Sequence, residues 1–211
     1  MDTNDNAPLP QLSPVEARIV ASLMEKEATT PDSYPLTLNA IVLACNQKTA
    51  REPTMDLEPG EVGHALRQLE VRGWVKSQHG SRAERYAHRL EAMLSLTRAQ
   101  AALLALLMLR GPQTAHELLA RSERLAQFNG VDDVQYALDR LSQRTPPLVV
   151  ALPRQPGQRG DRYAHLLGGE PDITESPVAA SGGSSTSLAE RVAALEQRMA
   201  ELEARLAARE G

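Results

Sequence analysis

Hydrophobic residues recur at helical spacing three times in succession, and the same series then occurs again along the chain. A helix is predicted over residues 14–27, where Val15, Ile19 and Leu23 fall on one face. Ser13 precedes it as an N-cap, and the glutamate three residues later completes a capping box. In the second copy Thr97 takes the place of Ser13, and the stretch "RAQAALLALLMLRG" predicts a helix that is buried over much of its surface.

A second helix follows in each copy. It is predicted from "LTLNAIVLACNQ" at residues 36–47 and from "TAHELLARS" at residues 114–122, where Thr114 is the expected N-cap. The third helices align best, because their apolar residues share the i, i+3, i+4, i+7 spacing of one buried face. The matching residues are Val62, Ala65, Leu66 and Leu69 in the first copy and Val134, Ala137, Leu138 and Leu141 in the second.

Each series ends in a stretch that predicts a β-hairpin, over residues 74–88 and 148–165. The tips and returning strands consist of "GSRAERYAH" and "GQRGDRYAH", which share a glycine, an arginine and an Arg-Tyr-Ala-His ending. Three helices and a hairpin, occurring twice, predict a mainly α protein with small β-hairpins (an α+β fold), built from two tandem winged helix-turn-helix domains. We name residues 12–90 repeat one and residues 91–167 repeat two.

Strand alternation places Tyr86 and His88 on one face of the first hairpin and Arg85 on the other. Tyr163, His165 and Arg162 repeat the arrangement. We expect the tyrosines to cover the core and the histidines to be its partly buried neighbours. A metal or catalytic role for the histidines is disfavoured because no carboxylate or further histidine lies at a ligand spacing along the sequence.

Outside the two repeats, three segments are expected to differ in character. Residues 1–11 are predicted to be a disordered leader and residues 168–187, rich in Gly, Ser and Pro, a flexible linker. Residues 188–210 predict a coiled-coil helix that makes the protein a homodimer, with the alternative that this helix folds back on its own domains. Its heptad seam consists of Leu188, Val192, Leu195, Met199, Leu202 and Leu206.

Composition narrows the functional classes. The chain has one Phe, one Trp and four Tyr, so extensive stacking on unpaired bases is disfavoured. The formal net charge of −4 arises at the two ends, because repeat one has no net charge and repeat two carries a small positive charge. This distribution is compatible with nucleic-acid binding but lacks a strongly basic footprint. Cys45 stands alone in an apolar run and is expected to be a packed thiol, which suits a reducing cytoplasm.

Two long stretches closely resemble the YceH-like family of uncharacterised bacterial proteins. They are "YPLTLNAIVLACNQKTAREP" and "PLVVALPRQPGQRGDRYAHLLGG", and the resemblance covers roughly residues 11–169. The resemblance implies two winged-helix domains. It implies no activity, ligand or site residues.

The leading functional hypothesis is binding of double-stranded DNA, as in transcription regulators, with a third helix in the major groove and a hairpin against the backbone. Arginine and glutamine can recognise base edges, and the cationic hairpin residues can contact phosphates. The candidate residues of repeat one are His64, Arg67, Gln68, Lys76, Arg82 and Arg85. Those of repeat two are Arg140, Gln143, Arg154, Arg159 and Arg162.

Repeat one is expected to be the better reader of DNA, because Asp132, Asp133 and Asp139 crowd the third helix of repeat two. The alternative function is a protein-interaction scaffold built from the same domains and oligomerised by the C-terminal helix. No enzyme activity, metal or cofactor is expected, because the sequence lacks a phosphate-binding glycine loop, a metal-ligand cluster and a nucleophile with a base. A small-molecule pocket between the domains stays open. With neither a secretory signal nor a membrane-length apolar run, the expected location is the cytoplasm.

Overall fold

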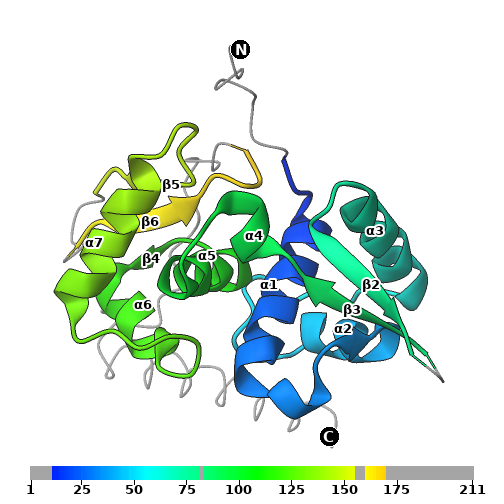
Figure 1. The fold of residues 1–211 in the computed structure, drawn as a ribbon. Coiled ribbons are helices and arrows are strands. Elements are labelled where there is room, and N and C mark those ends of the chain that lie inside the picture. The colour runs from blue at the N-terminus through cyan, green and yellow to red at the C-terminus, as the bar shows by residue number, and fades with distance from the viewer. Residues whose placement is uncertain (1–10, 81–82, 155–159, 170–211) are drawn as a thin grey trace, which may run out of the picture. The chain divides into compact units, whose positions relative to one another are not determined.

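A computed structural model describes residues 11–80, 83–154 and 160–169 and contains two copies of one arrangement of helices and strands (Figure 1). Repeat one comprises α1 (Pro14–Thr29), the 3-10 turn η1 (Pro31–Ser33), β1 (Leu36–Thr37), α2 (Leu38–Cys45), α3 (Pro59–Val71), β2 (Val75–His79) and β3 (Glu84–His88). The short helix α4 (Leu90–Leu94) spans the boundary between the repeats. Repeat two comprises α5 (Arg98–Arg110), β4 (Gln113–Thr114), α6 (Ala115–Ser122), α7 (Val131–Ser142), β5 (Val149–Leu152) and β6 (Arg162–His165). The architecture is thus α+β.

Each repeat contains a three-stranded antiparallel sheet with the returning hairpin strand at its centre. The strand orders are β1-β3-β2 and β4-β6-β5. Ser77 lies opposite Tyr86 and Ala151 lies opposite Tyr163, so both predicted hairpins are confirmed as paired strands. Strands β1 and β4 were not predicted, because each has only two residues, which is too few to show an alternation of polar and apolar side chains.

Helices α1, α5 and α6 begin where their capping residues predict, whereas α2 begins at Leu38, two residues later than predicted. Ser13, Thr97 and Thr114 are N-caps, and each forms a capping box with the Glu or Gln three residues later. Such caps stabilise a helix by roughly 1 kcal/mol, because they satisfy amides that have no partner within the helix. The apolar faces predicted for the third helices are confirmed as buried in both α3 and α7.

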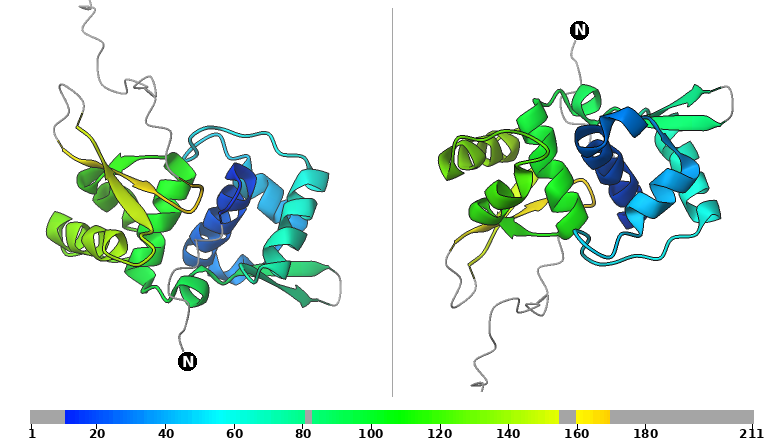
Figure 2. Two further views of the ribbon diagram at one scale, coloured as in Figure 1. Left: turned by 90° about the horizontal axis from the view of Figure 1, so that it is seen from above. Right: turned by 90° about the horizontal axis from the view of Figure 1, so that it is seen from below.

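The two repeats share one hydrophobic core, in which α1 of repeat one packs against α5 of repeat two. Figure 2 shows these helices side by side in both views. Every residue of α5 from Ala101 to Leu109 is buried, because α5 also contacts α6, α7 and β6. The prediction of a helix buried over much of its surface is therefore confirmed. Within the described ranges, no helix combines the length and apolarity needed to cross a bilayer.

Backbone hydrogen bonds also join the repeats. The amide of Leu12, before α1, donates to the carbonyl of Leu167, after β6, over 2.7 Å. The amide of Glu52 donates to the carbonyl of Leu109, at the end of α5, over 2.8 Å. The start of repeat one and its long loop before α3 are thus fixed to repeat two.

Two buried arginines hold the loop over residues 46–58 in place. The Arg18 guanidinium, on a residue that is 1% exposed, donates to the carbonyls of Cys45 (3.2 Å) and Pro53 (2.7 Å). Arg51, 3% exposed, donates to the carbonyl of Ala44 and to the carboxylate of Glu25. Burying a guanidinium is unfavourable unless it is paired, so these bonds are needed for the fold.

The lone cysteine is part of this packed region. Cys45 is fully buried, and burial raises the pKa of its thiol to about 11. A thiol with so high a pKa is not a nucleophile near neutral pH. The prediction of a packed thiol is confirmed.

The burial of His165, at the end of β6, is expected to make the stability of the protein depend on pH. Its Nδ1 is buried without a hydrogen-bond partner among the described residues, and burial lowers the pKa of the ring to about 4. The unfolded chain takes up this proton near pH 6.5, so the free energy of unfolding should fall as pH drops from 6.5 to 4. The expected contribution is about 1 to 3 kcal/mol, measured by urea denaturation across that pH range.

The variant His165→Gln should flatten this pH dependence, and His64→Gln, which removes an exposed histidine, is the matched control. Equal slopes in His165→Gln and the wild-type chain would show that the depressed pKa of His165 does not govern acid stability.

Candidate nucleic-acid interface

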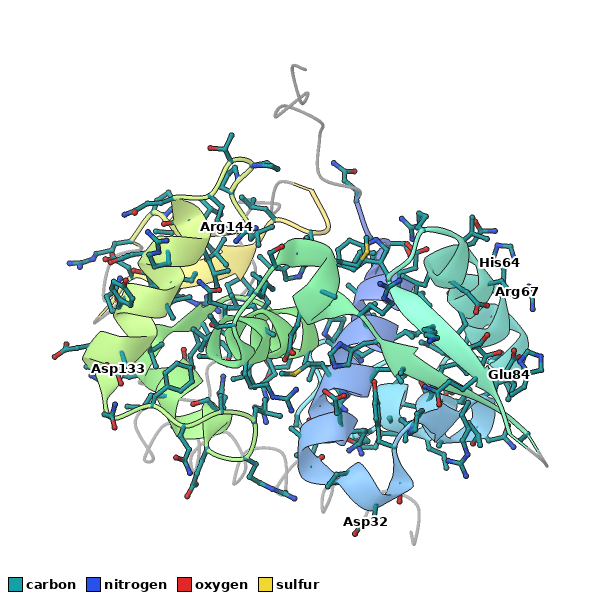
Figure 3. All side chains as sticks on the ribbon, viewed as in Figure 1. Asp32, His64, Arg67, Glu84, Asp133 and Arg144 are labelled. Atoms are coloured by element: carbon teal, nitrogen blue, oxygen red, sulfur yellow. The ribbon has the colours of Figure 1, made fainter. Side chains whose placement is uncertain are left out.

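The outward face of α3 presents three of the predicted side chains together. His64, Arg67 and Gln68 are all exposed, because the opposite face of α3 is taken up by the four apolar residues in the core. Figure 3 shows His64 and Arg67 projecting from the outer side of α3, away from α1. The helical periodicity of the sequence placed these three side chains correctly.

The side chain of Arg67 extends over Gly63, one turn earlier in α3. A Cβ atom added at Gly63 would lie 3.8 Å from the Arg67 guanidinium and 3.9 Å from the side chain of Leu38 in α2. The guanidinium therefore stands beside the start of α2, on a surface that α2 and α3 share. None of the hydrogen bonds within the described residues involves Arg67, so its five N–H donors are available to a ligand.

The hairpin of repeat one has carboxylates as well as an exposed cation on its surface. Lys76 on β2 is exposed, and two nearby carboxylates accept hydrogen bonds from other side chains. Glu70 accepts hydrogen bonds from the amide and hydroxyl of Ser77, which lower the pKa of its carboxyl group. Glu84 accepts a bond from the Tyr86 hydroxyl over 2.7 Å, and burial together with this carboxylate raises the pKa of Tyr86 to about 12.

A shallow cavity lies where α2, β3 and the hairpin turn meet. Its volume is about 270 Å³. The lining residues are Thr37, Leu38, Asn39, Ala83, Glu84 and Tyr86. The Glu84 carboxylate gives this hollow a negative side, which disfavours a phosphate there.

The repeated arginines of the two "RYAH" motifs have the same structural task. Arg85 donates to the carbonyl of Pro35 over 2.7 Å, and Arg162 donates to the carbonyl of Pro112 over 2.6 Å. Each bond ties the central strand of a sheet to the loop before its first strand. Both side chains were predicted as DNA contacts; each uses one guanidinium nitrogen for this hydrogen bond within the fold, and their contact with DNA stays a prediction.

One arginine of the hairpin of repeat two forms an ion pair within the hairpin. Arg154 forms a bidentate pair with Asp161, at 2.5 and 3.3 Å, and this pair lowers the pKa of the aspartate. The candidate residues Arg82 and Arg159 lie outside the described residues. The same holds for the whole heptad seam from Leu188 to Leu206.

Helix α7 differs from α3 at the positions that were predicted to contact DNA. When the buried faces are superimposed, Asp139 takes the place of Arg67 and Tyr136 that of His64. Arg140 and Gln143 are exposed as predicted, yet the first turn of α7 carries Asp132 and Asp133. An exposed carboxylate opposes binding of a polyanion.

The two third helices are far apart. α3 contacts α1 and α2, whereas α7 contacts α5, α6 and β5. In Figures 1 and 2, α3 and α7 lie at opposite ends of the two repeats, with α1 and α5 between them. The outward faces of α3 and α7 therefore do not form one continuous surface.

A charged cluster at the junction of the repeats was not predicted. The amide of Leu90 donates to Nδ1 of His88, so Nε2 must carry the ring proton that His88 donates to Glu27 over 3.0 Å. Glu27 also accepts a bond from Arg98 of α5 over 2.8 Å, and Arg98 reaches Glu91. Burial lowers the pKa of His88, although Glu27 opposes this effect.

Sequence spacing gave no sign of a carboxylate beside a histidine, because Glu27 is close to His88 in space although it is 61 residues away in sequence. The cluster joins β3 to α1 and α5, which fixes the hairpin of repeat one relative to repeat two. The expected core role of the tyrosines is met by Tyr163, which is buried, and in part by Tyr86, which packs at the edge of the core. Among the described residues, no group of three or more His, Cys, Asp or Glu side chains could hold a metal ion.

Comparison with known proteins gives a family but no activity. A family model described as "Protein of unknown function, DUF480" matches residues 12–158. UPF0502 protein Smlt0097 of Stenotrophomonas maltophilia (strain K279a) is 54% identical over 217 aligned residues, which cover 100% of this chain and 99% of the relative. UPF0502 protein XCC4136 of Xanthomonas campestris pv. campestris is 56% identical over 200 residues (91% of this chain, 89% of the relative). UPF0502 protein mll4256 of Mesorhizobium japonicum is 53% identical over 191 residues (90% and 91%).

The structural role of Arg85 can be separated from a binding role by stability. We expect Arg85→Ala to lower the free energy of unfolding by about 1 kcal/mol, because it removes a charged hydrogen bond to the Pro35 carbonyl. Arg67→Ala, an exposed arginine on α3, should change it by less than about 0.5 kcal/mol. Denaturation of the two variants measures the difference, and equal losses would contradict the assignment.

Proposed function

The chain belongs to the DUF480 family of bacterial proteins of unknown function, and from this premise we propose that it binds double-stranded DNA through repeat one. The resemblance to an uncharacterised bacterial family is thereby confirmed, but it supplies no activity. The proposal rests on a single observation. His64, Arg67 and Gln68 stand together on the exposed face of α3, beside a hairpin.

In this proposal each repeat is a winged helix-turn-helix domain. In repeat one, α2 and α3 are the helix-turn-helix pair and the β2–β3 hairpin is the wing. Helix α3 enters the major groove, as the second helix of such motifs does, and the wing lies along the phosphate backbone. The finding that supports this assignment is the arrangement of three helices and a three-stranded sheet in each repeat.

The side chains of α3 suit base recognition. Arg67 has the planar fork that pairs with O6 and N7 of guanine, and Gln68 can pair with N6 and N7 of adenine. Both are exposed and lie on adjacent positions of one helical face. Lys76 on the wing is an exposed cation suited to a phosphate contact.

Repeat two has a different part in the proposal. Arg154 is paired with the Asp161 carboxylate, which weakens its attraction for phosphate, and Arg162 uses one of its N–H groups on the Pro112 carbonyl. Arg140 and Gln143 are exposed, but they share α7 with carboxylates that repel DNA. Repeat two therefore supports repeat one through the common core, and its own third helix does not contact the same duplex.

A second candidate function is that of a protein-interaction scaffold. Tyr136 on α7 is 68% exposed, and exposed tyrosines are frequent anchors of protein interfaces. This function would use α7 rather than α3, so it predicts binding that is insensitive to changes in Arg67. Measurements on DNA decide between the two candidates.

The predicted C-terminal coiled coil would make the DNA-binding unit symmetric. A homodimer presents two copies of α3, and a two-fold symmetric protein recognises two half-sites related by the same symmetry. Arg191 and Arg198 at g positions would face Glu196 and Glu203 at e positions of the partner helix. This function requires that the protein is located in the cytoplasm, where the DNA of a bacterial cell lies.

The first test of the proposal measures binding of the full chain to a duplex selected from a random pool. We expect affinity to fall steeply with salt and Arg67→Ala to weaken binding by roughly 1 to 3 kcal/mol, because a bidentate base contact is lost. Lys76→Ala should lower the slope of log affinity against log salt by about 0.9, the value for one phosphate contact. Fluorescence anisotropy titrations at several salt concentrations measure both.

Arg140→Ala is the matched control, since it removes the same charge from an exposed position of the other third helix. It should leave affinity almost unchanged. Equal losses in Arg67→Ala and Arg140→Ala would contradict recognition by α3, and weak, salt-insensitive binding throughout would favour the scaffold.

The second test concerns the dimer. A chain that ends at residue 187 should be monomeric at micromolar concentration, whereas the full chain should be dimeric, because the truncation removes all six seam residues. Sedimentation equilibrium measures the two masses. Charge reversal at Glu196 and Glu203 to lysine should weaken the full-length dimer, and a dimer that survives truncation would place the interface elsewhere.

A further inference from the structure

The most exposed of the large hydrophobic side chains in the described part of the chain is Val71, the last residue of α3. It is 85% exposed, compared with 73% for Leu43 on α2 and 68% for Tyr136 on α7. A valine on a helix is normally buried, because its apolar surface is unfavourable in water and its branched Cβ lowers helix propensity. Packing within the described fold gives no reason for valine at this position.

The position of Val71 on the helix connects it to the proposed DNA-binding face. It follows Gln68 by three residues, Arg67 by four and His64 by seven, so it lies on the middle of the same outward face. The distance along the helix from His64 to Val71 is about 10 Å at 1.5 Å per residue. That length corresponds to about three base-pair steps of 3.4 Å each.

Along this face the side chains of His64, Arg67 and Gln68 are polar, and that of Val71, in the last turn, is apolar. In the major groove, thymine is distinguished from the other bases by its C5-methyl group, and small apolar side chains contact that methyl. A valine isopropyl group offers two methyl groups for this contact and no hydrogen-bonding atom that would compete with the polar readers. The equivalent position in repeat two is Gln143, the residue that follows α7, so repeat two has no apolar residue there.

We propose that Val71 is a specificity-determining residue that contacts the 5-methyl group of a thymine in the duplex bound by α3. This thymine lies within about three base pairs of the purine that Arg67 or Gln68 recognises. The inference rests on the proposed function and adds the base that the C-terminal turn of α3 selects. Burial of one methyl group in such a contact increases affinity about fourfold, from roughly 0.8 kcal/mol.

The experiment removes only the methyl group. The full chain is used to select duplexes from a random pool, and each thymine of the selected site is then replaced singly by uracil, which pairs identically. The wild-type chain is expected to lose affinity about three- to fivefold at one thymine and to be indifferent at the others. Val71→Ala should bind the thymine and uracil duplexes equally, and Val71→Ile should retain the preference.

Leu43→Ala is the matched control, because it truncates an exposed apolar residue on α2 outside this face and should keep the thymine preference. Both positions are exposed, so the midpoint of thermal unfolding should be unchanged and confirms that the variants are folded.

The outcomes separate this inference from the proposed function. Duplex binding without any thymine preference, or a preference that survives in Val71→Ala, would overturn the role of Val71 and leave DNA binding by α3 intact. Absence of duplex binding by the wild-type chain would overturn the proposed function and this inference with it. Loss of binding to another protein in Val71→Ala, with DNA binding unchanged, would assign the residue to a protein interface instead.

Discussion

The packing of α1 against α5 is the interaction on which the rest of the structure depends. Each helix is the first of its repeat, and together they form the centre of one continuous core. Because α5 is buried on every side, separating the repeats would expose apolar surface at a cost of about 25 cal/mol per Å². The repeats are therefore fixed relative to each other, with α3 and α7 at opposite ends (Figure 1). The third helices thus lie on separate surfaces, and their exposed residues differ, with Arg67 on α3 where α7 has Asp139.

The arginines that occur in both repeats have a structural role, whereas the arginine that we propose to bind DNA occurs in one repeat only. Arg85 and Arg162 occur in the repeated motif, and both donate to a proline carbonyl that precedes the first strand of the sheet. A residue that two copies of a fold have in common is explained by what every copy must do to fold. Arg67 has no counterpart in repeat two, where Asp139 replaces it, and it has no hydrogen-bonding task within the described fold. Exposed positions of α3 that differ between the two repeats are therefore better candidates for binding residues than positions that both repeats share.

Features set by neighbouring residues could be predicted from the sequence, whereas those set by distant residues could not. The capping residues, the buried faces of the helices and both hairpins follow from periodicity and local hydrogen bonding. For the candidate site, periodicity also placed His64, Arg67 and Gln68 on one exposed face. The partners of Arg18, Arg85 and His88 lie 27 to 61 residues away along the chain, so no local pattern contains them. An isolated Arg18 among the apolar residues of α1 was the one available signal of a buried guanidinium.

The charge of repeat one limits how it could bind DNA. Residues 11–90 contain equal numbers of acidic and basic side chains, and Arg85, Arg18 and Arg51 are committed to the fold. With no net positive charge in this repeat, sequence-independent attraction to the backbone would be weak. A binder of this kind depends on base contacts for most of its affinity, which makes the composition of the α3 face decisive. Under the proposed function Glu70 and Glu84 act in the same direction, because carboxylates beside the hairpin repel the phosphates of any DNA sequence.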